Sequence, residues 1–339
     1  MSRLVATATL LRGGGLPWLR AARDGLAAVR LSVGAAGLST GVLECLRDRP
    51  ADTSSVRARL GLDDGGLLEP WLRVLQAHGL VRASSGRWSL SRRGRRLLDD
   101  EVLRGAYEGF AGFHTGLYRE LTRQLHGGPP RRDVAERGET IAQLTRAMEP
   151  VLHEVLGTAV REARPARVLD VGCGAGQNLA AMLAAAPAAE GTGIEVDGAV
   201  ADIAERLLAQ RGLAGRTRVL RGDVLALAAG GEAGGPYDLA LLANVVYYLP
   251  LAERVRLFRA VAGLLSDDGA VLVTTTAAAP HPFSRHFDLL LRAQGEGMEL
   301  PEVEPLRRQL AEAGLRPAPA RRLVPGQPLV AVLARRREL

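Results

Sequence analysis

The stretch Val168-Leu169-Asp170-Val171-Gly172-Cys173-Gly174-Ala175-Gly176 decides the fold of this chain. It reads as an apolar strand with an acid near its end, then glycines at every second position, then a helix. Glycine allows a turn to take positive φ and lets the backbone come close to a ligand. The stretch therefore predicts a ligand site at the carboxyl edge of a parallel sheet.

The spacing of these glycines differs from two common phosphate-binding loops. A dinucleotide fingerprint, G-x-G-x-x-G, requires a glycine at position 177, where this chain has Gln177. A Walker loop requires a lysine, and all 44 basic residues of this chain are arginine. We therefore expect neither an NAD(P) site nor a P-loop.

Alternating strands and helices surround the glycine turn and continue towards the end of the chain. Strands are predicted at 167–171, 191–196, 217–221, 237–243 and 271–275, and a closing hairpin at 320–323 and 329–333. Helices are predicted between them at 178–186, 200–211, 253–265 and 303–314. This alternation predicts an α/β fold with a mostly parallel sheet and helices on both faces.

The first hundred residues predict a second, mostly helical domain. Its elements come in winged-helix order: short helices at 40–46 and 54–60, a longer helix through 70–78, and a hairpin of 80–83 with 87–90. We divide the chain into a poorly ordered lead-in with a first helix (1–35), a winged-helix domain (36–100), a helical connector (101–164) and an α/β domain (165–339).

Composition excludes several classes of protein. The chain has 339 residues, 47% hydrophobic and 24% charged, which excludes collagen-like, disordered and disulfide-scaffold proteins. No apolar run approaches the roughly 20 residues of a membrane helix. Leu4–Leu11 is mildly apolar but lacks a small-residue cleavage site, so we interpret it as a loose leader rather than an export signal. Cys45 and Cys173 stand in unrelated contexts, which favours a reduced, cytoplasmic protein.

The net charge of +7 lies entirely in residues 1–100, which hold 16 arginines and nine acidic residues. Six arginines cluster on and after the predicted wing: Arg82, Arg87, Arg92, Arg93, Arg95 and Arg96. Such a patch could contact phosphates, so one hypothesis is a DNA-binding regulator that senses a metabolite or a cofactor. The helix at 67–78 is too apolar for a DNA groove and suits burial, so we do not favour nucleic acid as a partner.

The motif at 168–176 resembles that of the class I S-adenosylmethionine-dependent methyltransferases. From about residue 36 to 339 the chain resembles bacterial small-molecule methyltransferases with an N-terminal winged-helix dimerisation domain. The resemblance implies a seven-stranded Rossmann-like sheet, S-adenosylmethionine as cofactor and a small, specialised metabolite as methyl acceptor. It also implies a homodimer formed through residues 36–100, and a connector that covers the active site.

The resemblance also implies the cofactor-binding residues. Glu195 would bind both ribose hydroxyls, and Asp223 would contact the adenine amino group while Val224 packs on the ring. Asp170 would orient the turn or reach the methionine amino group through water. The full expected set is Asp170, Gly172, Gly174, Gly176, Glu195, Asp223, Val224 and Asn244.

The residues expected near the methyl acceptor depart from the family pattern. O-methyltransferases of this architecture carry a His-Asp pair after the fourth strand, where this chain has Tyr247 and Tyr248. A phenol with a pKa near 10 is a poor base at neutral pH, so these tyrosines either position the acceptor or pack the turn. This favours carbon or nitrogen slightly over oxygen as the atom methylated.

Histidines elsewhere are candidates for the missing base. His281 and His286 follow the fifth strand beside Phe283 and Phe287, and with Tyr247 and Tyr248 they complete our set of catalytic candidates. No close spacing of metal-ligating residues is present, so we expect no metal. A third hypothesis is a catalytically idle relative, against which the intact turn and its acids argue.

Overall fold

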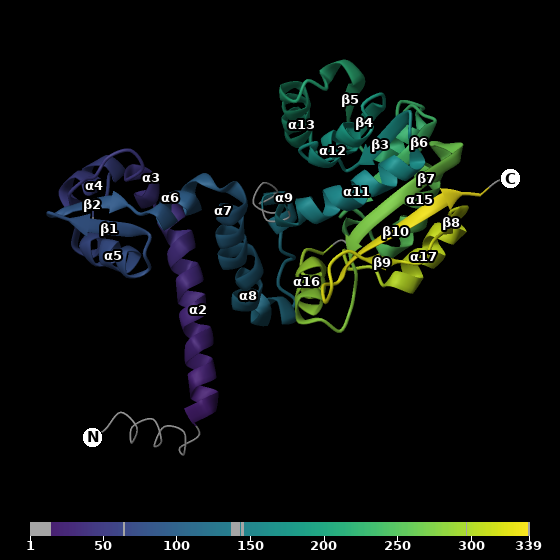
Figure 1. Cartoon of the computed structure of the whole chain (residues 1–339). Helices are drawn as coiled ribbons and strands as arrows, with labels where there is room; N and C mark the ends of the chain where they lie inside the picture. Colours follow the sequence, from purple (N-terminus) through teal and green to yellow (C-terminus); the bar gives the residue numbers. More distant parts are fainter. Residues whose placement is uncertain (1–14, 64, 137–142, 144–145, 296, 338–339) are drawn as a thin grey trace. The chain divides into compact units, whose positions relative to one another are not determined.

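The computed structural model describes residues 15–63, 65–136, 143, 146–295 and 297–337. The chain divides into two compact units (Figure 1). The N-terminal unit comprises Met1–His126 and Asp133–Ala147, and the C-terminal unit comprises Gly127–Arg132 and Met148–Leu339.

The N-terminal unit contains the predicted winged helix. It runs through α3 (Val42–Cys45), α4 (Thr53–Leu60), α5 (Gly65–Ala77), β1 (Val81–Ser84) and β2 (Arg87–Leu90). Asp52 caps α4 by accepting a hydrogen bond from the Ser55 amide at 2.8 Å, as its place before the helix predicts. β1 and β2 pair as an antiparallel hairpin, and Ala51 bridges to Trp88 beside it.

The first helix expected within residues 1–35 begins by residue 15 and is longer than the weak periodicity indicated. Residues 15–35 form most of α2 (Gly15–Ser39), a 25-residue helix. Its final turns are held by packing, because the Tyr107 ring fills the space that a Cβ at Gly34 would occupy. The segment Leu4–Leu11 lies outside the described residues.

Between residues 92 and 136 the chain is mostly helical, as predicted for the connector from residue 101 onwards, and the expected break at 127–130 lies in a non-helical stretch. It comprises α6 (Arg92–Asp99), α7 (Glu101–Glu108), α8 (Thr115–Leu125) and α9 (Asp133–Glu136). Between α7 and α8 the chain forms a π-helix, Gly109–His114, which buries Phe113 and His114. That this segment covers an active site stays a prediction.

A single sheet organises the C-terminal unit. Its strands are β3 (Arg167–Val171), β4 (Glu190–Glu195), β5 (Thr217–Arg221), β6 (Tyr237–Ala243), β7 (Leu265–Thr276), β8 (Leu315–Pro317), β9 (Arg321–Arg322) and β10 (Leu329–Arg336). Seven run in the order β5-β4-β3-β6-β7-β10-β8, and β9 pairs with β10. β3 to β7 pair in parallel and β10 pairs antiparallel, which confirms the predicted α/β fold. The sequence did not predict β8.

Helices cover both faces of this sheet (Figure 1). One face packs against α14 (Val224–Ala229), α15 (Arg254–Gly263) and α17 (Val303–Glu312). The other packs against α11 (Glu149–Ala163), α12 (Gln177–Ala185) and α13 (Gly198–Gln210). α16 (Pro282–Arg292) follows β7. Although α11 falls in the expected connector, its apolar side chains belong to the core of the C-terminal unit.

Three negative findings apply to the part of the chain that the structure describes. No helix there is long and apolar enough to cross a membrane. No group of three or more histidine, cysteine, aspartate or glutamate side chains there could hold a metal ion. Both cysteines, Cys45 and Cys173, are free thiols.

The Asp238 carboxylate should be a main anchor of the sheet's amino edge. It accepts hydrogen bonds from the amides of Ala166 and Arg167 at 2.8 and 3.0 Å and from the Ser266 hydroxyl at 3.0 Å. Asp238→Ala should lower the free energy of unfolding by about 2–4 kcal/mol, because three donors lose their acceptor. Urea denaturation measures this. Asp268→Ala, at an exposed position on β7, is the control; equal stability of the two variants would contradict the assignment.

Candidate functional site

The predicted cofactor residues lie at the carboxyl edge of the parallel strands. β5, β4, β3 and β6 are consecutive neighbours in the sheet. The turn after β3, Glu195 at the end of β4, Asp223 after β5 and Asn244 after β6 therefore share one edge. Open α/β sheets bind ligands at this edge.

The glycine turn has the conformation that the sequence predicts. Gly172, Gly174 and Gly176 have φ values of 68°, 53° and 82°, a region that favours glycine. A Cβ at Gly172 would lie 2.6 Å from Cγ2 of Val245, whereas a Cβ at Gly174 would meet nothing within 4 Å. Gly172 thus permits close packing with the loop after β6, and Gly174 faces open space that a ligand can enter.

The Glu195 carboxylate connects the glycine turn to the end of β4. Its Oε2 accepts a hydrogen bond from the Gly174 amide at 2.9 Å, and its Oε1 accepts one from the Asp197 amide at 3.0 Å. Each oxygen keeps a lone pair for a further donor. This arrangement can accept hydrogen bonds from a cis-diol without moving.

Asp170 lies beneath the turn, within the protein. Its side chain is 0% exposed, and neither carboxyl oxygen has a hydrogen-bond partner among the described residues. Burial, together with the nearby negative charge of Glu195, raises the pKa of this carboxyl to about 7. The sequence placed the acid correctly but did not predict its lack of a partner.

The residues after β5 and β6 are partly engaged in local structure. Asp223 caps α14, its Oδ1 accepting hydrogen bonds from the Leu225 and Ala226 amides. Val224, expected to pack on adenine, is 9% exposed and belongs to the core of the sheet. Asn244 has φ 58°, and its backbone N–H donates a hydrogen bond to the Thr274 carbonyl at 2.8 Å. The cofactor roles of these three residues stay predictions.

The tyrosines after β6 belong to an aromatic cluster with α16. Tyr247 is 2% exposed and makes edge contacts with Tyr248 and Phe287, at ring-centroid distances of 4.7 and 5.4 Å. Phe287 stacks on Phe283 at 6.0 Å. Burial raises the pKa of the Tyr247 hydroxyl well above its usual range and also raises that of Tyr248. Both hydroxyls are therefore neutral at physiological pH.

The two histidine candidates lie at the start of α16. His281 is the residue before this helix, and its Nδ1 is buried with no hydrogen-bond partner in the described part of the chain. The His286 ring lies 6.3 Å from the Phe283 ring, and burial lowers the pKa of His286. A neutral imidazole can accept a proton, so this helix can supply a base.

Sequence reasoning missed two residues that shape the turn. A Cβ at Gly193 would lie 2.7 Å from the Cys173 sulfur, so this glycine lets Cys173 pack against β4. Val245 fills the space beside Gly172. A glycine inside a strand marks the close approach of another group, and that signal could have identified Gly193. Nothing in the sequence marked Val245.

One family model matches the chain: residues 168–269, from the glycine turn to the start of β7, match the methyltransferase domain. Comparison with curated proteins gives no match. The matched segment contains the turn and all eight residues expected to bind the cofactor.

Three solved structures are each similar to nearly the whole chain. The mitomycin 7-O-methyltransferase MmcR is 24% identical, with a TM-score of 0.70, and the match covers 97% of this chain and 100% of that one. The N,N-8-amino-8-demethyl-D-riboflavin dimethyltransferase RosA from Streptomyces davawensis is 22% identical, with a TM-score of 0.76 and coverages of 94% and 99%. The O-methyltransferase NcsB1, solved with S-adenosyl-L-homocysteine and 1,4-dihydroxy-2-naphthoic acid, is 22% identical, with a TM-score of 0.67 and coverages of 91% and 96%.

The Glu195 bridge gives a direct test of the site. Glu195→Ala removes the acceptor of two backbone amides and of any ligand diol, so S-adenosylhomocysteine should bind about tenfold more weakly or worse. Isothermal titration calorimetry measures this. Glu190→Ala, at the exposed start of the same strand, is the matched control and should bind normally. Unchanged affinity in Glu195→Ala would refute the assignment of the site.

Proposed function

We propose that this chain, whose residues 168–269 match the methyltransferase domain, is a class I S-adenosylmethionine-dependent methyltransferase that methylates a small aromatic acceptor on nitrogen or carbon. The observation that carries the choice of acceptor atom is the buried, neutral tyrosine pair after β6. It stands where a catalytic base would be expected.

The residues at the sheet edge fit the cofactor. The turn leaves open space at Gly174, where any side chain would narrow the approach. Glu195 offers oxygens to the ribose hydroxyls, and Asp170 offers unpartnered oxygens to a cationic group. When bound, S-adenosylmethionine supplies a methyl carbon on a positively charged sulfur. The protein then contributes mainly alignment of the acceptor with that carbon.

The aromatic cluster after β6 favours a flat, apolar acceptor. The Tyr247 ring makes an edge contact with the Phe287 ring, which in turn stacks on the Phe283 ring. Phe283 is 36% exposed. Aromatic side chains bind planar ligands by stacking and edge contacts. The naphthoic acid in the NcsB1 structure is a ligand of this kind.

The choice of acceptor atom follows from proton chemistry. A phenol acceptor must lose its proton before or during methyl transfer, which requires a base unless the phenol is already ionised. Tyr247 and Tyr248 cannot serve, because their raised pKa values keep them protonated. A neutral amine or an activated carbon reacts without prior deprotonation. RosA, a similar structure, is an N,N-dimethyltransferase.

Paired acceptors test this choice. Two naphthalene acceptors that differ only in an amino or a hydroxyl group should differ in kcat/KM at pH 7, with the amine preferred. Methylation of the phenol should rise about tenfold per pH unit towards the phenol's own pKa, because ionisation in solution supplies the phenolate. Labelled S-adenosylmethionine measures both rates, with reactions lacking the protein as the control.

The proposal would be contradicted if the phenol were methylated as fast as the amine and its rate stopped rising near pH 7. That result would show a working base on the protein. The single variants His281→Asn and His286→Asn would then show which histidine is the base. In the variant that lacks the base, the rate of phenol methylation should again rise with pH as the phenol ionises in solution.

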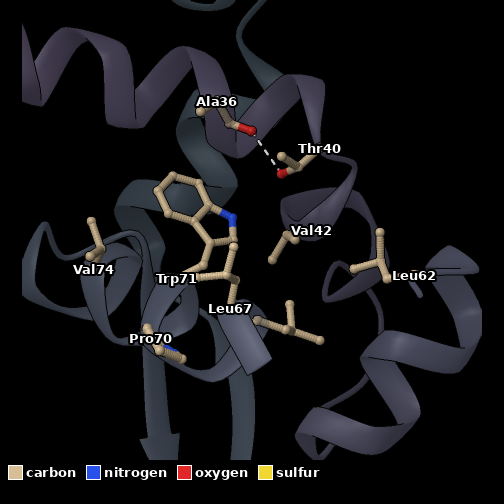
Figure 2. Close-up of a pocket in the computed structure, with 9 residues that line it drawn as sticks. Ala36, Thr40, Val42, Leu62, Leu67, Pro70, Trp71 and Val74 are labelled. Atoms are coloured by element: carbon tan, nitrogen blue, oxygen red, sulfur yellow. Dashed lines mark hydrogen bonds between the residues drawn. The ribbon is translucent and has the colours of Figure 1, made fainter. Parts of the chain in front are cut away.

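We further propose that the N-terminal unit forms a homodimer. An apolar groove of about 500 Å³ lies beside α5, and Figure 2 shows Trp71, Leu67 and Val74 along it. Leu67 is 69% exposed, which is unusual for a leucine on a folded helix. The same unit exposes further large apolar side chains along α2: Leu16, Trp18, Leu19, Leu26 and Val29. A second copy would cover these surfaces.

The wing arginines argue for this partner over DNA. Arg87 donates to the Pro50 carbonyl, Arg93 to the His78 carbonyl and Arg95 to the Arg47 carbonyl. These guanidinium groups therefore serve the fold of the unit itself. The exposed side chains of α5 along the groove are apolar, whereas a helix that reads DNA presents polar groups to base edges.

Charges placed on this groove should separate the two copies. Leu67→Asp with Val74→Asp should convert a dimer to a monomer, because association would bury two carboxylates. Light scattering coupled to size-exclusion chromatography measures the mass. Ile203→Asp, at an exposed apolar position on α13, is the control and should remain dimeric. A wild-type monomer, or a dimeric double variant, would refute this interface.

A further inference from the structure

Arg254, the first residue of α15, is a charged side chain buried within the C-terminal unit. Its exposure is 1%, and its guanidinium donates hydrogen bonds to two backbone carbonyls that lie far apart in the chain. Nε donates to the Leu249 carbonyl at 3.1 Å, and Nη2 donates to the Glu299 carbonyl at 2.6 Å. Burying a charge is costly unless it is paired and hydrogen-bonded. These contacts therefore compensate the burial and join two segments.

The peptide group between Glu299 and Leu300 is held from two helices. Arg254 of α15 binds its carbonyl, and the Asp288 carboxylate of α16 accepts a hydrogen bond from its N–H at 2.9 Å. Arg292 pairs with the carboxylates of Asp288 and Glu299, at 2.9 and 2.7 Å. Two arginines and two acids thus form a neutral group, which lowers the cost of burying Arg254.

The two segments that this arginine joins also carry part of the aromatic cluster. Leu249 directly follows the turn that contains Tyr247 and Tyr248. Leu300 packs with Tyr247 and with Leu291 of α16. The contacts at the Leu249 and Glu299 carbonyls therefore fix the tyrosine turn relative to the side chains behind it.

We propose that Arg254 is a positioning residue for the methyl acceptor. It fixes the loop that carries Tyr247 and Tyr248 against the segment before α17, and so sets the position of the aromatic rings at which the acceptor binds. Its guanidinium is buried and bonded to backbone carbonyls, so it acts through those rings rather than on the acceptor itself. This inference rests on the proposed function.

The geometry of an arginine suits this role. The planar guanidinium presents its N–H groups in fixed directions, so one side chain holds two carbonyls at a set separation. A small displacement of positioning groups slows a reaction that depends on alignment. The cofactor turn is held instead by Glu195, and the loop after β6 begins with a backbone hydrogen bond from Asn244 to Thr274. Loss of Arg254 should therefore affect the acceptor and spare the cofactor.

Steady-state kinetics with 1-naphthylamine as acceptor test this role. Arg254→Met keeps an unbranched apolar stem and removes both donors, so the KM for 1-naphthylamine should rise about tenfold. The Kd of S-adenosylhomocysteine, measured by calorimetry, should stay within about twofold of the wild-type value. A merely structural role predicts a different result, because loss of folded protein lowers the apparent kcat and leaves the KM unchanged.

Three further variants sharpen the comparison. Arg254→Lys keeps a charged donor without the planar fork, so its KM should lie between those of the wild type and Arg254→Met. Asp288→Ala removes the other hydrogen bond to the same peptide group, at a side chain that is 19% exposed. It should also raise the KM, and it keeps the inference testable if Arg254→Met does not fold. Arg256→Met, at an exposed position on α15 paired with Glu253, is the matched control and should keep the wild-type KM.

Hydrogen exchange gives a readout that needs no acceptor. The Leu249 amide donates to the Val246 carbonyl and the Leu300 amide to Asp288, so each joined segment contains a protected N–H. In Arg254→Met, peptides that cover 246–250 and 297–301 should exchange faster than in the wild type. Peptides that cover the glycine turn at 172–176 should exchange at the wild-type rate.

Several outcomes would overturn the inference. These are an unchanged KM in folded Arg254→Met, a lower kcat at unchanged KM, an equal loss of affinity for S-adenosylhomocysteine, and hydrogen exchange that matches the wild type in both segments. Failure of the wild type to methylate 1-naphthylamine would instead refute the proposed acceptor. The exchange rates would still test whether Arg254 holds the tyrosine turn in place.

Discussion

The structure at the ligand edge depends on the carboxylate of Glu195. By accepting one hydrogen bond from the Gly174 amide and one from the Asp197 amide, it joins the turn after β3 to the turn after β4. The Gly172 and Cys173 amides, which donate to the Ile194 carbonyl at 2.8 and 3.0 Å, also hold the turn after β3 to β4. Hydrogen bonds from backbone amides to a charged acceptor are stronger than those between neutral groups. The site is therefore shaped before a ligand arrives, and binding need not order it.

Two acids close together at this edge, Glu195 and Asp170, have different surroundings. Glu195 accepts two backbone hydrogen bonds that suit a carboxylate, whereas Asp170 has none and holds its proton to about pH 7. Burial without donors favours the neutral form of an acid, and donors favour the charged form. The contrast between these two acids arises from side-chain packing. The sequence alone therefore did not predict that Asp170 lacks the backbone donors that Glu195 has.

Much of the fold could be predicted because local chemistry determines it. Asp52 and Gly61 fix the ends of α4, and the glycine spacing after Val171 fixes the central turn. The elements whose extent or existence the sequence did not predict depend on distant contacts. α2 ends against Tyr107, some seventy residues away, and β8 exists because β10 pairs with it. In the same way, Val245 shapes the turn through a side-chain contact that no local pattern records.

The contact between Val245 and Gly172 joins the two halves of the candidate site. Val245 precedes the tyrosine pair, and its side chain lies in the space beside Gly172, in the turn that we propose holds the cofactor. Because the two loops touch, a ligand that moved one of them would change the free energy of binding at the other. Such a coupling free energy is reciprocal, so each ligand alters the affinity of the other by the same factor. The free energy of binding both ligands is then the same whichever of them binds first.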